Sequence, residues 1–179
     1  MNVLVACEFS GIVRDAFLDM GHNAISCDLE PSERPGPHLQ GDVEAALRFG
    51  WDLIIAFPPC THICVSGNRW YAGTRERDLG VIFAKQFWEY ADKVCIENPV
   101  SVLSSHWRRP TQIIQPWMFG HGETKATCLW LKGLEPLSPT RVVDGRQARV
   151  HRMAPSPVRS RERSRTYAGI AAAMAEQWG

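Results

Sequence analysis

Cys60 stands in a setting that suits a reactive thiol better than a structural one. It follows Pro58 and Pro59 directly, at the end of the apolar run 53–57. Two prolines fix two φ angles and remove two backbone donors, so they would hold the cysteine rigidly at the end of a buried strand. A cysteine that only fills a core needs no such support. The pattern therefore predicts a nucleophile at Cys60, with a buried small hydrophobic residue as the alternative.

Glu97 and Asn98 end a second apolar run, 93–96, and offer the groups that such a thiol would need beside it. A thiolate can add to carbon-6 of a pyrimidine, which makes carbon-5 nucleophilic toward a one-carbon electrophile. A carboxyl group hydrogen-bonded to ring nitrogen-3 and the exocyclic amine stabilises the charge that develops. We expect backbone amides or an arginine to lower the pKa of Cys60 so that it ionises. Alternatively, Glu97 is an acid at a helix N-terminus before Ser101.

Strands alternate with helices along the first hundred residues. Apolar runs predict strands over 2–7, 22–27, 52–57 and 93–96, and helical spacing predicts helices over 12–20, 43–49 and 76–90. Such alternation is typical of an α/β fold with a mostly parallel sheet and helices on both faces. Ligands bind such sheets at the carboxyl ends of the strands. The residues expected at that edge are Glu8 to Gly11, Asp28, Asp42, Cys60 and Glu97.

The composition is that of one ordinary globular domain over residues 1–179. Hydrophobic residues make up 45% and charged residues 22% of the chain, and no run approaches the roughly 20 apolar residues of a membrane span. The N-terminus lacks the basic flank of a secretory signal, so we expect a cytoplasmic protein with reduced thiols and no membrane partner. Cys60 and Cys64, with His62 between them, have no second ligand pair at zinc spacing, so no metal site is expected.

Basic charge is concentrated in residues 141–165. This segment holds eight arginines against two acidic residues, whereas the net charge of the whole chain is only +1 and residues 1–140 are net acidic. A polyanion would therefore meet its phosphate contacts here. The segment is predicted to be a DNA-contacting loop or arm, with a solvated surface loop as the alternative. Its four candidate contact residues are Arg159, Arg161, Arg163 and Arg165.

These residues resemble motifs of the DNA cytosine-5 methyltransferase family. Pro58-Pro59-Cys60, followed by Ser66-Gly67, is similar to the family's Pro-Pro-Cys motif, and Glu97-Asn98-Pro99 is similar to its Glu-Asn-Val motif. Phe9-Ser10-Gly11, preceded by Glu8, resembles the family's first motif. Residues 124–134 and 163–178 resemble small phage-type members. The resemblance implies a Rossmann-like class I methyltransferase fold, S-adenosylmethionine as the cofactor, DNA as the substrate, and a bacterial or phage-infected host cell.

The resemblance also implies roles for individual residues. Cys60 would be the nucleophile, with Glu97 and Asn98 at the catalytic site. The implied cofactor-binding residues are Glu8, Phe9, Ser10, Gly11, Asp28, Leu29, Asp42, Val43, Phe57 and Pro58. Within that set Asp28 would bind the ribose and Asp42 the adenine amine, although Asp28 could be a turn residue and Asp42 or Ser10 a helix cap. The implied substrate or DNA contacts are Pro59, His62, Ser66, Asn68, Lys125 and the four arm arginines.

Three departures from the family keep other functions open. Phe57 stands where the family has glycine, residues 12–14 replace a glycine pair, and no long target-recognition region is present. Sequence selectivity is therefore expected to be low or to be supplied elsewhere, and the substrate to be single-stranded DNA or a base flipped out of a duplex. The first alternative is cytosine hydroxymethylation, or methylation of a free nucleotide such as dCMP, with a folate one-carbon donor. The second alternative is an inactive DNA-binding or anti-restriction module. The oligomeric state stays open.

Overall fold

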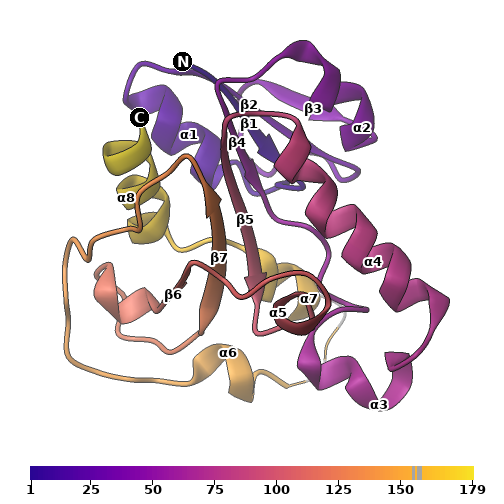
Figure 1. Cartoon of the computed structure of the whole chain (residues 1–179). Coiled ribbons are helices and arrows are strands. Elements are labelled where there is room, and N and C mark those ends of the chain that lie inside the picture. Colours follow the sequence, from indigo (N-terminus) through magenta and orange to yellow (C-terminus); the bar gives the residue numbers. More distant parts are fainter. Residues whose placement is uncertain (155, 157–158) are drawn as a thin grey trace.

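The computed structural model describes residues 1–154, 156 and 159–179. Its centre is a seven-stranded sheet in the order β3-β2-β1-β4-β5-β7-β6, with helices on both faces (Figure 1). The strands are β1 (Asn2–Ala6), β2 (Asn23–Asp28), β3 (His38–Gln40), β4 (Leu53–Ala56), β5 (Lys93–Pro99), β6 (Gln112–Ile114) and β7 (Thr127–Lys132). β7 runs antiparallel to its neighbours β5 and β6, and the other neighbouring strands pair in parallel. The predicted α/β class with a mostly parallel sheet is confirmed.

Two apolar layers hold the helices onto the sheet. The α-helices are α1 (Ile12–Asp19), α2 (Val43–Ala46), α3 (Asn68–Tyr71), α4 (Arg75–Gln86), α5 (Leu103–His106), α6 (Arg149–Arg152), α7 (Arg159–Ser164) and α8 (Ala168–Trp178). Val3 and Val5 face the layer that contains α1 and α8, whereas Leu4 and Ala6 face the layer that contains α2 and α4. Successive strand residues point to opposite faces. A central strand covered on both faces is therefore apolar throughout, as the sequence runs indicate.

The strand that carries Glu97 is longer than predicted. We expected it to end at residue 96, but β5 continues through Pro99, with Glu97 opposite Leu129 and Asn98 opposite Cys128 of β7. Pairing with the antiparallel strand β7 extends β5 past residue 96. The residues of β7 were not predicted as a strand. No helix in the described part of the chain is long and apolar enough to cross a membrane.

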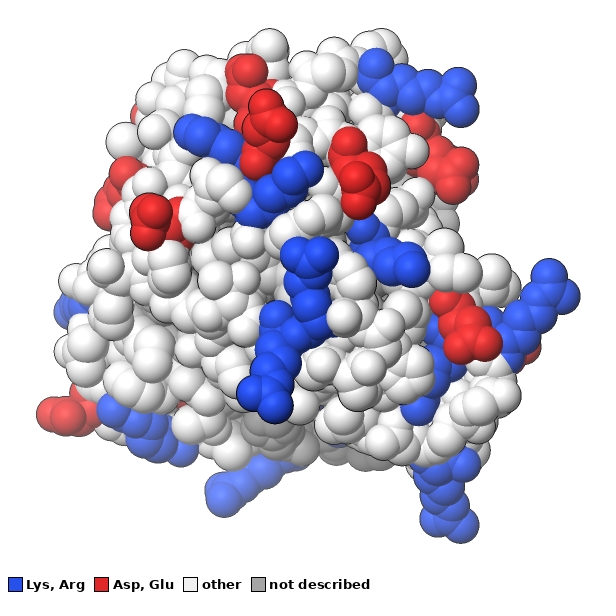
Figure 2. Space-filling view, in the orientation of Figure 1, with Lys and Arg blue, Asp and Glu red and all other residues white. Residues whose placement is uncertain are grey.

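The arginine-rich segment 141–165 contains the short helices α6 and α7, and its residues 155 and 157–158 lie outside the described residues. In the lower part of Figure 1, α6 and α7 lie with α3 and α5, where β5 ends. In the same orientation, Lys and Arg side chains project along the lower edge, whereas most of the Asp and Glu side chains lie in the upper half (Figure 2). The basic side of this face is therefore the side at which β5 ends.

Candidate functional site

Cys60 follows β4, Glu97 lies within the neighbouring strand β5, and a side-chain hydrogen bond links the two segments. β4 and β5 pair in parallel up to the residues just before Phe57 and Glu97, so the chain after β4 lies beside the end of β5. Asn98 is buried, and its Nδ2 donates a hydrogen bond of 2.9 Å to the carbonyl oxygen of Pro58. This bond holds the start of the Cys60 loop against β5, and Cys60 itself is half-buried.

The thiol of Cys60 is not activated in this structure. Burial raises its pKa above the ordinary value, and the neighbouring Cys64 and Glu97 add to the shift. The charges of Lys125 and Arg163 act in the opposite direction but do not outweigh burial. The expectation of a lowered pKa is therefore wrong here, because the desolvation of the thiol outweighs the cations beside it. A role of Cys60 as a nucleophile would therefore require further positive charge or bound substrate to lower this pKa.

Burial also raises the pKa of Glu97, and Lys125 opposes this shift. A carboxyl whose folded pKa lies above its unfolded value stabilises the fold fully below the unfolded value, about 4.5, and loses that contribution as the pH rises through the folded pKa. Glu97→Gln is therefore expected to raise the thermal unfolding midpoint at pH 7–8, with a gain over wild type that shrinks toward pH 4. Thermal scans across this range test it. A gain that does not change with pH would contradict it.

The chain after β1 is organised by a buried carboxylate. Glu8 Oε1 accepts hydrogen bonds from Ser10 Oγ at 2.7 Å and from the backbone N–H of Val13 at 3.1 Å. It therefore satisfies a donor in the first turn of α1, where a negative charge is favourable. The other oxygen, Oε2, is buried and has no hydrogen-bond partner among the described residues. Gly11 has φ +71°, in the left-handed region that glycine adopts at least cost.

Arg14 lies in the segment 12–14, where the sequence departs from the glycine pair of the family that it resembles. Its side chain is 0% exposed, and a Cβ atom added to Gly11 or Gly36 would lie 2.5 Å or 2.9 Å from its guanidinium. The guanidinium donates hydrogen bonds to Asp15 Oδ1, Ser26 Oγ, Ser32 Oγ and the carbonyl oxygens of Arg34 and Pro35. Arg14 therefore fastens the loop after β2 to α1. The sequence interpretation missed this role, although Arg14 lies beside Val13 and one turn from Phe17, on the buried face of α1.

The two carboxylates expected at the cofactor make local hydrogen bonds. Asp28 Oδ1 accepts from the N–H of Glu30 at 2.9 Å, and burial raises the pKa of Asp28. Asp42 Oδ1 accepts from the N–H of Glu44 at 3.0 Å and caps α2, the alternative that the sequence left open. Both side chains stand where β2 and β3 end, and their cofactor roles stay predictions. Of the other predicted cofactor residues, Phe9, Val43 and Pro58 are buried, Phe57 is half-buried and Leu29 is exposed.

Helix α7 is held against the loop after β2 by ion pairs, which the sequence did not predict. Arg161 pairs with Glu30 and, at 2.7 Å, with Glu33. Arg165 donates two hydrogen bonds of 2.8 Å to Glu33, and these contacts lower the pKa of Glu33 to about 2. The guanidinium of Arg161 lies 4.5 Å from the ring centroid of Phe9. Two of the four predicted DNA-contacting arginines therefore already have acidic partners within the protein.

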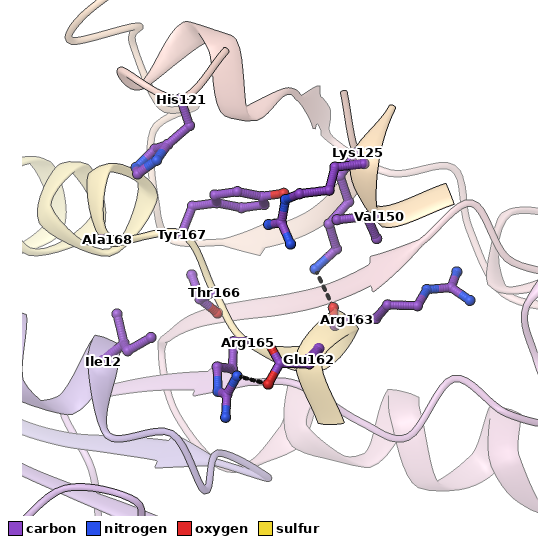
Figure 3. Close-up of a pocket in the computed structure, with 11 residues that line it drawn as sticks. Ile12, His121, Lys125, Val150, Glu162, Arg163, Arg165, Thr166, Tyr167 and Ala168 are labelled. Atoms are coloured by element: carbon purple, nitrogen blue, oxygen red, sulfur yellow. Dashed lines mark hydrogen bonds and ion pairs between the residues drawn. The ribbon is translucent and has the colours of Figure 1, made fainter. Parts of the chain in front are cut away.

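A cavity of about 220 Å³ lies beside α7, between the start of α1 and the chain leading into β7 (Figure 3). Among the residues that line it are Ile12, His121, Lys125, Arg163, Thr166 and Tyr167. Lys125 Nζ donates to the carbonyl oxygen of Arg163 at 2.9 Å, and the hydroxyl of Tyr167 donates to Glu123 at 2.8 Å. The positive charge of Lys125 also opposes the rise in the pKa of both Cys60 and Glu97. The lining carries four basic side chains, Lys125, Arg149, Arg163 and Arg165, against one acidic side chain, Glu162, and it does not include Cys60 or Glu97.

The loop after Cys60 folds back on itself. The N–H of Cys64 donates to the carbonyl oxygen of Cys60 at 2.8 Å, and the ring of His62 packs edge-on against Tyr71 at 4.7 Å. Of the residues predicted to contact substrate, Pro59, Ser66, Asn68 and Arg163 are exposed, and His62, Lys125 and Arg159 are half-buried. Within the described ranges, no group of three or more His, Cys, Asp or Glu side chains is placed to hold a metal ion.

No family model and no curated protein sequence matches the chain. Solved structures do match. One is described as a DNA modification methyltransferase encoded within an E. coli prophage, at 13% identity and a TM-score of 0.52, covering 80% of this chain and 52% of that one. Another is the Entamoeba histolytica methyltransferase EhMeth, at 12% identity and a TM-score of 0.50, covering 80% and 57%. The chain spans about half the length of these structures, and it has the Rossmann-like fold of class I methyltransferases.

Proposed function

We propose that the chain transfers a methyl group from S-adenosylmethionine to carbon-5 of cytosine in DNA through a covalent adduct at Cys60. The observation that carries this proposal is the placement of Cys60 shortly after β4 and of Glu97 in the neighbouring strand β5, with the two segments joined by the hydrogen bond from Asn98 to Pro58. The methyltransferase fold and the DNA-modifying description of one structural neighbour support it. A relation to small phage-type enzymes, and with it a bacterial or phage-infected host, belongs to the same proposal.

Each catalytic candidate has a chemical task in this reaction. The Cys60 thiolate forms a bond to carbon-6, and the ring electrons move to carbon-5, which becomes the nucleophile. Glu97, whose pKa burial raises, holds a proton more readily than an exposed carboxyl and can donate it to ring nitrogen-3. Lys125 supplies positive charge beside both groups. Elimination of the thiolate after loss of the carbon-5 proton restores the aromatic ring.

The residues at the ends of β1, β2 and β3 fit a nucleoside cofactor, which supplies the electrophilic methyl group when bound. Asp28 offers an acceptor for ribose hydroxyls, Asp42 offers one for an exocyclic amine, and Phe9 offers an apolar ring. The buried Oε2 of Glu8, which has no hydrogen-bond partner in the described part of the chain, is a further acceptor that suits a cationic group. A folate donor would give Asp28 and Asp42 no evident role, so these residues favour S-adenosylmethionine.

Trapping on a mechanism-based substrate tests the proposal. An oligonucleotide that contains 5-fluorocytosine cannot lose a proton from carbon-5, so the enzyme stays attached after methyl transfer. Intact mass of wild type with S-adenosylmethionine is expected to show protein plus oligonucleotide plus one methyl group. A complex that forms only with a folate one-carbon donor would favour the first alternative. DNA binding with no complex under either condition would favour an inactive binding module.

The arm arginines are expected to differ in their contribution to DNA binding. Lys125 and Arg163 take part in none of the ion pairs of the described residues, whereas Arg161 and Arg165 must first leave Glu30 and Glu33. The double change Lys125→Gln with Arg163→Gln is therefore expected to weaken binding equally for unrelated sequences. It is also expected to reduce the slope of log K against log salt by about 1 for each lost phosphate contact.

Affinity measured for two unrelated sequences between about 50 and 200 mM salt tests this expectation. The matched control is Arg161→Gln with Arg165→Gln, which should change the slope less. An unchanged slope in the Lys125 and Arg163 variant would contradict a phosphate-contacting role.

A further inference from the structure

The loop that carries Cys60 also exposes a tryptophan, which the sequence interpretation did not single out. Trp70, on α3, is 68% exposed. The turn that leads into α3 begins at Val65, an exposed residue whose N–H donates to the carbonyl oxygen of the equally exposed Val100 at 3.3 Å. Val100 comes three residues after Glu97. Exposed apolar side chains therefore lie in both segments that supply the catalytic candidates, and such groups often mark an interaction site.

The helix that carries Trp70 is anchored to the loop that follows Cys60. Its neighbour Tyr71 packs on the ring of His62, and a Cβ atom at Gly67 would lie 3.1 Å from the Tyr71 ring. The Nε of Arg77, at the start of α4, donates to the carbonyl oxygen of His62 at 3.0 Å. These contacts hold α3 beside the loop that carries Cys60 and leave the Trp70 side chain exposed.

The charge around Trp70 suits a polyanion. Residues 57–75 contain no Asp or Glu but include Arg69 and Arg75, and the guanidinium of Arg69 lies 5.9 Å from the centroid of the Trp70 ring. Basic side chains also project along the lower edge of the molecule, toward which α3 lies (Figure 2). An aromatic ring combined with positive charge is the combination by which proteins bind unpaired nucleic acid. A nucleic acid therefore fits this surface better than an apolar protein partner does.

We propose that Trp70 stacks on an unpaired base next to the target cytosine, and that the substrate is single-stranded or locally unpaired DNA. This inference rests on the proposed function and specifies the substrate that it acts on. The faces of bases are open to an aromatic side chain only where the strand is unpaired. Stacking accepts every base, so this contact does not require a particular sequence beside the target. Arg69 lies where it can contact the adjoining phosphate.

Affinities of Trp70 variants for a single-stranded oligonucleotide and for its duplex test the proposal. Trp70→Ala and Trp70→Leu are expected to weaken single-strand binding about tenfold and duplex binding less than about twofold, because only the unpaired strand offers a base to stack. Trp70→Phe, which keeps an aromatic face, should retain most of the affinity. The matched control is Phe49→Ala. Phe49 is 72% exposed and comes before the start of β4, whereas Cys60 comes after the end of the same strand. It should bind as wild type does.

Three outcomes would overturn the stacking role. One is an unchanged single-strand affinity in Trp70→Ala, another is an equal loss on single strand and duplex, and the third is a Phe variant as weak as the Leu variant. Thermal unfolding of each variant checks that the fold is kept, which the exposure of Trp70 makes the expected result. The 5-fluorocytosine reaction separates the two proposals. Trapping by wild type together with unchanged affinity of Trp70→Ala rejects stacking alone, whereas no trapping and no binding by wild type rejects the proposed function.

Discussion

Cys60→Ser is expected to abolish the covalent complex with 5-fluorocytosine DNA and to lower methyl transfer by about a thousandfold or more, the scale on which removal of a nucleophile acts. Serine is nearly the same size, so the half-buried site and the hydrogen bond from Asn98 to Pro58 should persist. Its hydroxyl, however, does not ionise at accessible pH and is a poor nucleophile toward carbon-6. Intact mass and the transfer of a labelled methyl group measure the two losses.

Cys64→Ser is the matched control for this prediction. Cys64 lies on the same loop, and its N–H bonds to the carbonyl of Cys60, but its thiol is not the proposed nucleophile. It should keep trapping, and Cys60→Ser should keep DNA affinity. If Cys60→Ser still forms the complex, or if both variants lose it equally, the assignment of Cys60 is wrong.

Arg14→Met is expected to lower the free energy of unfolding by about 3 kcal/mol or more, the scale for removing one partner from a buried charged network. The side chain of Arg14 is fully buried, so its loss leaves acceptors without the donor that now serves them, among them Ser26 Oγ and the carbonyl oxygen of Pro35. Among the described residues, Asp15 would retain only its contact with Arg34. Urea denaturation followed by circular dichroism measures the change.

Arg34→Met provides the comparison, because Arg34 pairs with the same Asp15 but is half exposed. A pair of this kind contributes less than about 1 kcal/mol. If the two variants lose equal stability, then the burial of Arg14 does not increase its contribution to the free energy of unfolding, and the prediction is wrong. A loss in Arg14→Met is also expected to weaken cofactor binding, since Arg14 holds the loop that follows Asp28.

Four of the five inner strands were predicted from the sequence, whereas the inner strand β7 and the two edge strands, β3 and β6, were not. β1, β2, β4 and β5 are covered on both faces or lie next to strands that are, so their residues form short apolar runs between polar ends. β3 and β6 have only three residues each, too few for a periodic pattern. β7 lies 28 residues beyond β5 in the chain, and only the folded structure shows that it lengthens β5 past Glu97.

In the candidate site, too, features that depend on neighbouring residues in the sequence could be predicted, and features that depend on tertiary contacts could not. The placement of Cys60 and Asp28 after strands depends on the local pattern, so the sequence located both. The pairs of Arg161 and Arg165 with Glu33 join residues about 130 positions apart, and no local pattern contains them. The direction of the pKa shift of Cys60 depends on how many groups surround the thiol, which tertiary packing alone decides. The exposure of Trp70 is equally a tertiary property.

The hydrogen bond from Asn98 to Pro58 has a consequence for the entropy of any reaction at this edge. Two groups on independent segments would lose conformational freedom each time they converged on a substrate. Here the loop that carries Cys60 is joined to the strand that carries Glu97. The conformational freedom of these two segments is therefore lost once, when the sheet folds. In the proposed reaction, a base would therefore meet a thiol and a carboxyl carried by two backbone segments that are already joined, which would lower the entropic part of the barrier.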